Sequence, residues 1–245
     1  MKLKLINPNT TWHMTHKIDA CARQVAAPGT VIESASPSMG PASIESYYDE
    51  ALAVPGLLQE IRSGETAGCD AYIVACFGDP GLDAARELAK GPVIGIAQAA
   101  MHLASMVGTG FTVVTTLGRT CNQAWHLAER YGMTRFCRNV RACEVPVLEL
   151  DQPGSGARAL ILASCMQALE DDGCDVLVLG CAGMADLCEY ISAETGVPVI
   201  DGVTAAVKLA ESLVSLKLKT STRGDFAAPP HKAYSGVLAP FGMVR

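Results

Sequence analysis

Two cysteines in this sequence occupy the same local setting, and their side chains could do chemistry together. Asp70 leads into an apolar run that ends at Cys76, and Asp175 leads into an apolar run that ends at Cys181. A Gly-Cys pair precedes each Asp, and the offset between the two copies is 105 residues. The repeat indicates an internal duplication with two similar halves, each presenting a thiol at the same place. Two thiols that face one cleft could exchange protons with opposite faces of one carbon atom.

The residues that follow each cysteine favour acid and base chemistry. Each apolar run gives way to small or flexible residues, at 77–81 in one half and at 182–184 in the other. A thiol at the start of a helix lies near the positive end of the helix dipole and near free N–H groups, so we expect lowered thiol pKa values. The same N–H groups could stabilise an enolate oxygen. One thiolate and one thiol would then invert a carbon without a metal or an organic cofactor.

The alternative for any single cysteine is simple packing, because buried cysteines usually act as small apolar side chains. The repeat favours a functional role for Cys76 and Cys181, since both copies place the thiol at a strand end. We expect the remaining cysteines to pack as small hydrophobes: Cys21, Cys69, Cys121, Cys137, Cys143, Cys165, Cys174 and Cys188. No Cys-x-x-Cys pair occurs, which disfavours metal and redox sites. The chain is not small and shows no secretory signal, which disfavours a disulfide scaffold.

The elements that must position the two thiols can be read from apolar runs and helical patterns. We expect strands at residues 3–6, 30–33, 71–75, 93–96, 111–115, 141–145, 176–179 and 199–200. We expect helices at residues 44–63, 82–90, 119–131, 157–171, 185–195 and 204–216. Alternation of apolar strands with helices predicts an α/β fold with parallel sheets covered on both faces.

The repeat divides this fold into two pseudo-symmetric, doubly wound lobes of about four strands each. The predicted lobes span residues 1–105 and 106–218, with approximate boundaries, and residues 219–245 form a tail that packs loosely or against a neighbour. Open parallel sheets bind ligands beyond the carboxyl ends of their strands. We therefore expect the strand-end loops of both lobes to converge on one cleft between them.

Composition excludes several classes of function. Apolar residues make up 49% of the chain and charged residues 18%, which is typical of a globular enzyme and not of a disordered chain. The formal charge of -6 argues against a nucleic-acid partner. No apolar run approaches the length of a membrane span, and the N-terminus lacks the apolar run of a signal peptide. A cytoplasmic protein with a small-molecule partner is the resulting expectation.

Residues outside the repeat give weaker signals. Asp49 and Glu50 indicate a solvated helix face, with a small chance that they line the cleft. Tyr48 follows a loop that could reach a substrate. His13 and His16 are spaced as a metal pair could be, although a solvated helix face is the simpler interpretation. Neither a dinucleotide fingerprint nor a phosphate-binding loop pattern is present.

Four segments together resemble a known family. Residues 6–10 (INPNT), 76–81 (CFGDPG), 114–117 (VTTL) and 180–184 (GCAGM) are similar to those of the hydantoin and allantoin racemases, within the aspartate/glutamate racemase superfamily. The resemblance covers about residues 3–216. It implies two pseudo-symmetric α/β lobes, a cofactor-independent two-base mechanism and assembly into homo-oligomers.

Matched residue by residue, the resemblance makes Cys76 and Cys181 the two acid/base groups. It implies that the substrate ring is held by the loops that carry Asn9, Phe77, Gly78, Thr115, Thr116, Ala182 and Gly183. Ile44 and Tyr48 are candidates for the wall around the substituent of the ring.

The loops also depart from the wider superfamily. In the amino-acid racemases of this superfamily the two cysteine loops resemble Cys-Asn-Thr and Cys-Thr-His. After its two cysteines this chain has Phe77-Gly78 and Ala182-Gly183 instead. Such loops offer backbone amides and apolar surface, which suit a neutral cyclic diamide better than a zwitterion. We therefore predict racemisation at C5 of 5-substituted hydantoins, allantoin being a strong candidate. The alternatives are a racemase of a small amino acid, a cis-trans isomerase of a diacid, and a two-lobed small-molecule binding protein.

Overall fold

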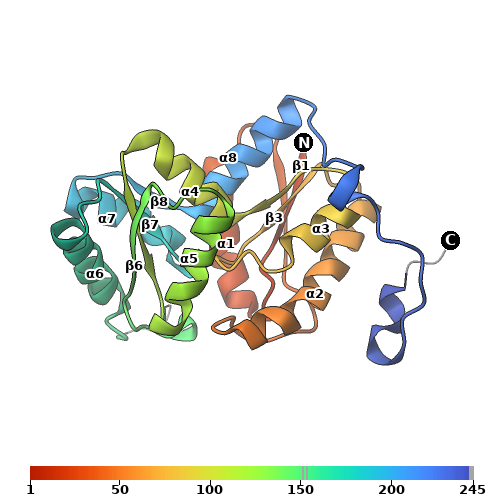
Figure 1. The fold of residues 1–245 in the computed structure, drawn as a ribbon, viewed down its shortest axis with the longest axis horizontal. Coiled ribbons are helices and arrows are strands. Elements are labelled where there is room, and N and C mark those ends of the chain that lie inside the picture. Colours follow the sequence, from red (N-terminus) through yellow and green to blue (C-terminus); the bar gives the residue numbers. More distant parts are fainter. Residues whose placement is uncertain (151, 153, 243–245) are drawn as a thin grey trace.

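The chain folds into two lobes, each built on a four-stranded parallel sheet flanked by helices (Figure 1). The computed structural model describes residues 1–150, 152 and 154–242. The strands are β1 (Lys2–Ile6), β2 (Val31–Ala35), β3 (Ala71–Val74), β4 (Val93–Gly95), β5 (Phe111–Thr115), β6 (Cys137–Ala142), β7 (Val176–Leu179) and β8 (Val199–Asp201). The helices are α1 (Trp12–Val25), α2 (Tyr47–Thr66), α3 (Leu82–Leu88), α4 (Ile96–Val107), α5 (Cys121–Arg130), α6 (Ala157–Asp171), α7 (Cys188–Thr195) and α8 (Gly202–Ser215). Short 3-10 helices are η1 (Gly118–Thr120), η2 (Val147–Glu149), η3 (Ala182–Leu187), η4 (Gly224–Phe226) and η5 (Gly236–Phe241).

The two sheets share one topology. The first has the strand order β2-β1-β3-β4 and the second the order β6-β5-β7-β8, with every pair parallel. The equivalent strands β3 and β7 are entirely apolar and entirely buried. Parallel strands covered by helices on both faces require apolar side chains on both sides, which explains these runs. The predicted α/β fold with two lobes of parallel strands is confirmed.

Helices α4 and α8 cross between the lobes. Helix α4 follows β4 of the first sheet and packs against β7 and β8 of the second. Helix α8 follows β8 of the second sheet and packs against β3 and β4 of the first. The two helices start in close contact, because a side chain at Gly202 would clash with the backbone carbonyl of Ile96. Because each of these helices follows a strand of one sheet and packs on the other sheet, they couple the two lobes. The division of the chain at residue 105 stays a prediction.

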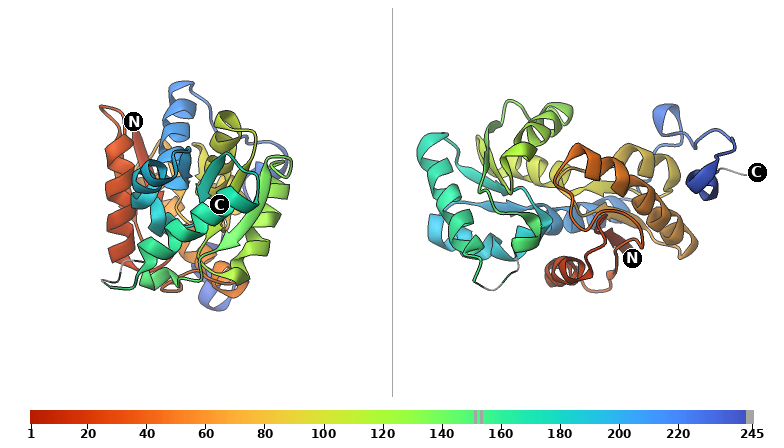
Figure 2. Two further views of the ribbon diagram at one scale, coloured as in Figure 1. Left: turned by 90° about the vertical axis from the view of Figure 1, so that its left-hand side faces the viewer. Right: turned by 90° about the horizontal axis from the view of Figure 1, so that it is seen from below.

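The lobes lie side by side along the longest axis of the molecule, and the C-terminal segment extends beyond the first lobe (Figures 1 and 2). Thr220 Oγ1 donates to the Gly91 carbonyl at 2.6 Å. The Arg62 guanidinium on α2 donates to the carbonyls of Pro240 and Phe241, both at 2.9 Å. The described part of the tail is therefore attached to the first lobe of its own chain. Among the described residues, no helix is both long and apolar enough to span a membrane.

Element boundaries differ from the predicted ones where local hydrogen bonds decide them. Helix α2 begins at Tyr47 and not at residue 44, because Ser46 Oγ accepts from the Asp49 N–H at 3.2 Å and caps the helix. The strand predicted at 141–145 is β6, which begins at Cys137. The first residues of β6 include Arg138 and Asn139, so they lack the apolar run by which strands were predicted. Polar residues are accommodated there because β6 is an edge strand of the sheet. Helix α7 begins at Cys188, after the 3-10 helix η3.

Candidate active site

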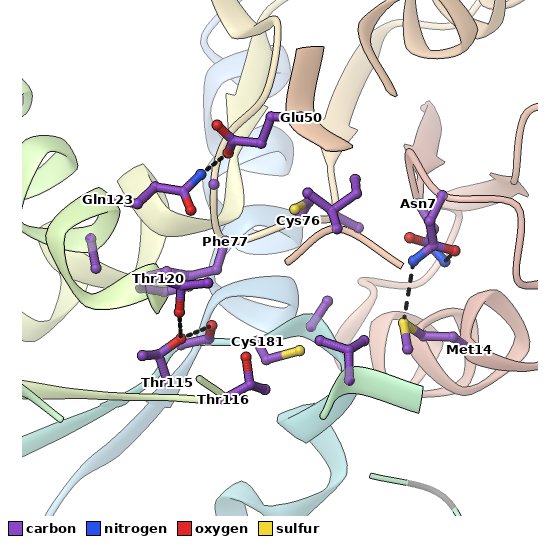
Figure 3. A pocket seen from close by; sticks show the side chains of 18 residues that line it. Asn7, Met14, Glu50, Cys76, Phe77, Thr115, Thr116, Thr120, Gln123 and Cys181 are labelled. Carbon is purple, nitrogen blue, oxygen red and sulfur yellow. Dashed lines mark hydrogen bonds between the residues drawn. The ribbon is translucent and has the colours of Figure 1, made fainter. Parts of the chain in front are cut away.

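Cys76 and Cys181 meet at one cavity between the lobes. The strand pairing of β3 and β7 continues to the residue before each cysteine. Ala75 N donates to Ile6 O at 2.8 Å, and Gly180 N donates to Val114 O at 2.8 Å. Figure 3 shows the two side chains on different sides of the cavity. The space it encloses is about 590 Å³, part of it open to solvent. Its place beyond the carboxyl ends of parallel strands is where open α/β sheets bind their ligands.

The cavity is lined by residues from both lobes. Those named from the sequence are Asn9, Ile44, Cys76, Phe77, Gly78, Thr115, Thr116, Cys181 and Ala182. Those that the sequence did not single out as binding residues are Asn7, Met14, Glu50, Ala75, Thr120, Gln123, Ala124, Val147 and Gly180, although the cleft was the alternative considered for Glu50. Asn7 and Gly180 adjoin the named residues, so the strand-end rule could have found them. Glu50 and Gln123 reach in from α2 and α5, for which that rule gives no signal.

The side chains of Tyr48 and Glu50 lie in the opposite environments from those predicted. The Tyr48 side chain is 73% exposed and does not line the cavity, whereas Glu50 does. With 3.6 residues per helical turn, two residues two positions apart point to nearly opposite sides of α2. The interpretation of Glu50 as part of a solvated face is therefore wrong. So is the placement of Tyr48 in the wall.

Gly183, predicted to hold the ring, is not among the described lining residues of the cavity, and it belongs to the loop that carries Cys181. Its carbonyl accepts from Lys17 Nζ on α1 at 2.7 Å. The same ammonium pairs with Asp186 at 2.8 Å. Because α1 belongs to the first lobe and η3 to the second, Lys17 ties the Cys181 loop to the opposite lobe.

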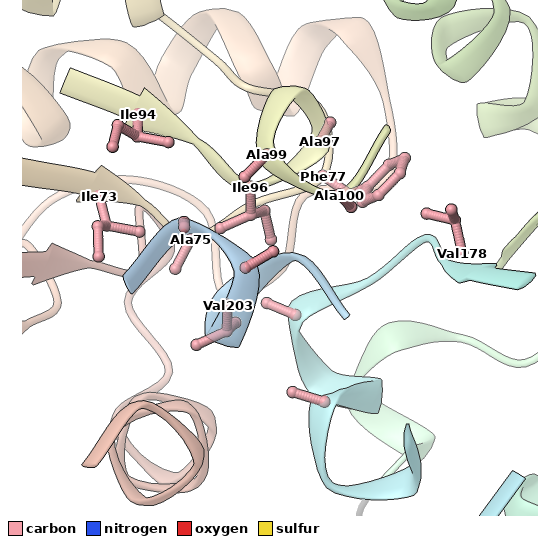
Figure 4. Packing of buried hydrophobic residues seen from close by; sticks show 14 of the residues in the cluster. Ile73, Ala75, Phe77, Ile94, Ile96, Ala97, Ala99, Ala100, Val178 and Val203 are labelled. Carbon is pink, nitrogen blue, oxygen red and sulfur yellow. The ribbon is translucent and has the colours of Figure 1, made fainter. Parts of the chain in front are cut away.

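One hydrophobic core underlies both cysteine loops. The cluster joins buried residues of the first sheet, such as Ile73, with buried residues of the second, such as Val178. Figure 4 shows Phe77 beside Ala97 and Ala100 of helix α4, which is part of the same cluster. Since α4 packs on the second sheet, the residue after Cys76 is anchored to the lobe that carries Cys181.

The loop after β1 is held by its own amide side chains. Asn7 Nδ2 donates to Asn9 Oδ1 at 2.9 Å and to Thr15 Oγ1 at 3.0 Å. The Thr11 N–H donates to Asn9 Oδ1 at 2.9 Å, at the start of α1. Both asparagines are buried, and these bonds fix their polar atoms at the cavity edge.

The second lobe contributes hydroxyl groups in the corresponding place. Thr115 and Thr120 share a hydrogen bond of 3.1 Å between their hydroxyl oxygens. Thr115 Oγ1 also donates to the Gly180 carbonyl at 3.3 Å, directly before Cys181. Thr116 lies beside Cys181 in Figure 3 and is buried. The cavity thus combines apolar surface with fixed amide and hydroxyl groups.

The pKa of the Cys76 thiol is raised and not lowered, which corrects the expectation drawn from the helix dipole. Burial is the main cause. A hydrogen bond from the Gly78 N–H acts in the opposite direction but does not offset it. The charges of Glu50, Cys181 and Asp79 raise this pKa further. The charge of Cys181 is therefore felt at Cys76, as expected for two thiols that share one cavity.

Two carboxyl groups surround the Cys76 loop. Asp79 accepts from the N–H groups of Ala97 (3.1 Å) and Gln98 (2.9 Å) at the start of α4, and from the Tyr131 hydroxyl at 2.6 Å. Burial nevertheless raises the pKa of Asp79 to about 6. Burial, together with the charge of Asp79, raises the pKa of Glu50 to about 7. The first lobe thus places two carboxyl groups beside its own thiol, Cys76.

Comparison with known proteins identifies the family. Residues 3–210 match the family model "Asp/Glu/Hydantoin racemase". A hydantoin racemase of Pseudomonas sp. is 46% identical over 99% of this chain and 97% of its own length. A hydantoin racemase of Rhizobium meliloti is 49% identical over 96% of this chain and 98% of its own.

Solved structures agree with this match. An allantoin racemase from Klebsiella pneumoniae superposes with a TM-score of 0.97 at 51% identity, covering 99% of both chains. A glutamate racemase from Francisella tularensis, with a TM-score of 0.65 and 19% identity over 91% of this chain and 84% of its own, shares the fold. The predicted resemblance and the predicted enzyme class of isomerase are confirmed. This chain belongs to the Asp/Glu/hydantoin racemase family.

Proposed function

We propose that this protein racemises 5-substituted hydantoins at C5, with allantoin as a strong candidate substrate, by proton transfer between Cys76 and Cys181. The observation that carries the proposal is the convergence of both repeated thiols on one cavity whose described wall contains no Lys, Arg or His. Such a wall suits a neutral cyclic diamide, because a carboxylate substrate would lack a cation to pair with.

The reaction requires one thiolate and one thiol on opposite faces of the ring. The thiolate removes the C5 proton, and the electron pair of the C–H bond moves into the neighbouring carbonyl to form an enolate. The opposing thiol then delivers its proton to the other face of C5 and becomes the thiolate. Backbone N–H groups of the cysteine loops and the hydroxyl group of Thr116 are the donors proposed for the enolate oxygen, because the Thr115 hydroxyl already donates to the Gly180 carbonyl. No metal or organic cofactor enters this scheme.

The alternative substrates are small amino acids and unsaturated diacids. Both carry carboxylates, and the only carboxyl group in the described cavity wall, Glu50, would repel them. This difference favours hydantoins within the family.

Polarimetry of the chiral compounds, together with proton NMR for the achiral maleate, tests the proposal. Purified protein, without added cofactor and with a chelator present, is incubated with D- and L-5-alkylhydantoins, (R)- and (S)-allantoin, D-glutamate and maleate. We expect loss of optical rotation for hydantoins or allantoin and no turnover of the two acids. Failure to racemise any hydantoin and allantoin, or turnover of the acids alone, would refute the proposal. A binding protein without activity would instead keep its ligand affinity after Cys76 and Cys181 are alkylated.

We also propose that the protein is a cytoplasmic homo-oligomer. The C-terminal segment exposes Val237 and Leu238, apolar side chains that a second copy could cover. Light scattering during size-exclusion chromatography tests the assembly. A mass of one chain would contradict it.

A further inference from the structure

One ionisable side chain in the cavity has no part in the proton transfer. Glu50 reaches into the cavity from α2 of the first lobe, and Gln123 reaches in from α5 of the second. Gln123 Nε2 donates a hydrogen bond to Glu50 Oε1 across the two lobes (Figure 3). Apart from the two thiols, Glu50 is the only readily titratable group in the described wall.

The absence of a side chain at Gly78 leaves space for Glu50 and Gln123 beside the Cys76 loop. A side chain at Gly78 would clash with the Glu50 carboxylate, and its Cβ would lie 2.8 Å from Gln123 Nε2. The backbone two residues after Cys76 therefore lies directly against both side chains. A group bound between Glu50 and Gln123 would be adjacent to the carbon that Cys76 serves.

Glu50 is held where its charge is costly. Burial and the nearby Asp79 both disfavour the carboxylate, and Gln123 donates a neutral hydrogen bond to it. A buried carboxylate is stabilised by further N–H donors. A carboxylate offers about four lone-pair sites on two oxygens, so Oε2 can accept while Oε1 keeps its bond from Gln123. The amide of Gln123 has a second N–H that can donate to a ligand carbonyl.

We propose that Glu50 and Gln123 form the subsite for the substituent at C5 and that this subsite takes a ureido group. One ureido N–H donates to Oε2 of the Glu50 carboxylate, and the adjacent ureido carbonyl accepts from the second N–H of Gln123. This inference rests on the proposed function, since it names the substituent that the same cavity prefers. An alkyl substituent would leave both polar side chains against apolar surface, which costs binding energy.

The test compares a ureido and an alkyl substituent on the same ring. We measure kcat/KM for allantoin and for 5-isopropylhydantoin in the wild type, in Glu50→Gln and in Glu50→Leu. Glu50→Gln should lower the ratio of allantoin to 5-isopropylhydantoin at least tenfold, and Glu50→Leu should lower it further. Glu170→Gln, which changes an exposed residue of α6, is the matched control and should leave the ratio unchanged. Equal losses on both substrates would overturn the proposal, because Glu50 would then serve the ring or Cys76.

Calorimetric binding separates this proposal from the proposed function. If the wild type racemises neither compound but Glu50→Gln weakens the binding of allantoin alone, the subsite stands and the racemase function fails. If the wild type racemises the alkyl compound and does not bind allantoin, the subsite is wrong and the racemase function stands. Wild type that binds neither compound contradicts both.

Discussion

The loop after Cys76 and the loop after Cys181 leave equivalent strands and are held by opposite charges. The first loop is fixed by the Asp79 carboxyl on the amides of α4 and lies against Glu50. The second is fixed by the Lys17 ammonium on the Gly183 carbonyl. Duplication has thus placed the thiols symmetrically, while their electrostatic surroundings differ. The comparison teaches that Cys76, with its raised pKa, holds its proton more strongly than a free thiol does.

Removing either thiol should have the largest effect and show whether both sides are needed. Cys76→Ser and Cys181→Ser should each lower racemisation at least about a thousandfold, since each removes one of two acid/base groups. One enantiomer should still exchange its C5 hydrogen in deuterated water, and that enantiomer should differ between the two variants. Polarimetry and proton NMR measure the two rates. Full racemase activity in either variant would refute the two-base mechanism.

Adding a methyl group to each cysteine loop should have the second-largest effect on activity and should affect the two loops differently. Gly78→Ala would force its Cβ into the Glu50 carboxylate, whereas the Cβ of Gly183→Ala would meet the flexible Leu150 side chain at 2.9 Å. We expect kcat/KM to fall about a hundredfold for Gly78→Ala, because small displacements of reacting groups cost factors of this size. Gly183→Ala should cost about tenfold or less. The reverse order of these effects would show that the second loop is the tighter one.

Releasing the Cys181 loop should have a smaller effect. Lys17→Met keeps the length of the side chain and removes the hydrogen bond to Gly183, so Cys181 should be less well positioned. We expect kcat to fall about fivefold with KM nearly unchanged, because loosening affects the geometry of proton transfer more than ring binding. Arg158→Met on α6 serves as the distant cation control. An unchanged kcat in Lys17→Met would show that the loop holds its shape without the ammonium.

The smallest effect concerns stability and its dependence on pH. The native pKa of Glu50, about 7 against an ordinary 4.5, means that the native state binds this proton more strongly than the unfolded state does. Native stability therefore falls as pH rises from about 4.5 to 7. Glu50→Gln should be more stable than the wild type by about 1 kcal/mol at pH 8, and the difference should shrink toward pH 4.5. Denaturant unfolding at both values measures it, and an equal difference at both would contradict the raised pKa.

The sequence predicts the parts of the site that follow from strand order. Cys76 and Cys181 were found because the same local setting occurs twice, and Thr115 and Thr116 because the family resemblance covers their loop. The strand-end rule then placed all four at the carboxyl ends of parallel strands. The exchange of α4 and α8 was not predicted, since no helix was expected at residues 96–107. Even for α8, apolar periodicity shows that a helix is buried and not which sheet buries it.

The remaining errors concern side chains whose surroundings come from distant segments. Glu50 and Tyr48 lie two positions apart on α2, and only the position of the second lobe decides which of them is enclosed. The pKa of Cys76 was predicted in the wrong direction for a related reason. The local N–H of Gly78 is visible in the sequence, but burial by the opposite lobe is not.

The central claim is that two thiols on opposite faces invert one carbon, and deuterium incorporation tests it most directly. Each single enantiomer of the best hydantoin substrate is incubated with wild-type protein in deuterated water, and the reaction is stopped early. We predict deuterium at C5 of the product enantiomer and protium at C5 of the recovered substrate, because the thiol that delivers is not the thiolate that removes. Equal early deuterium content in the recovered substrate and the product would contradict the account, since it would indicate a single base on one face.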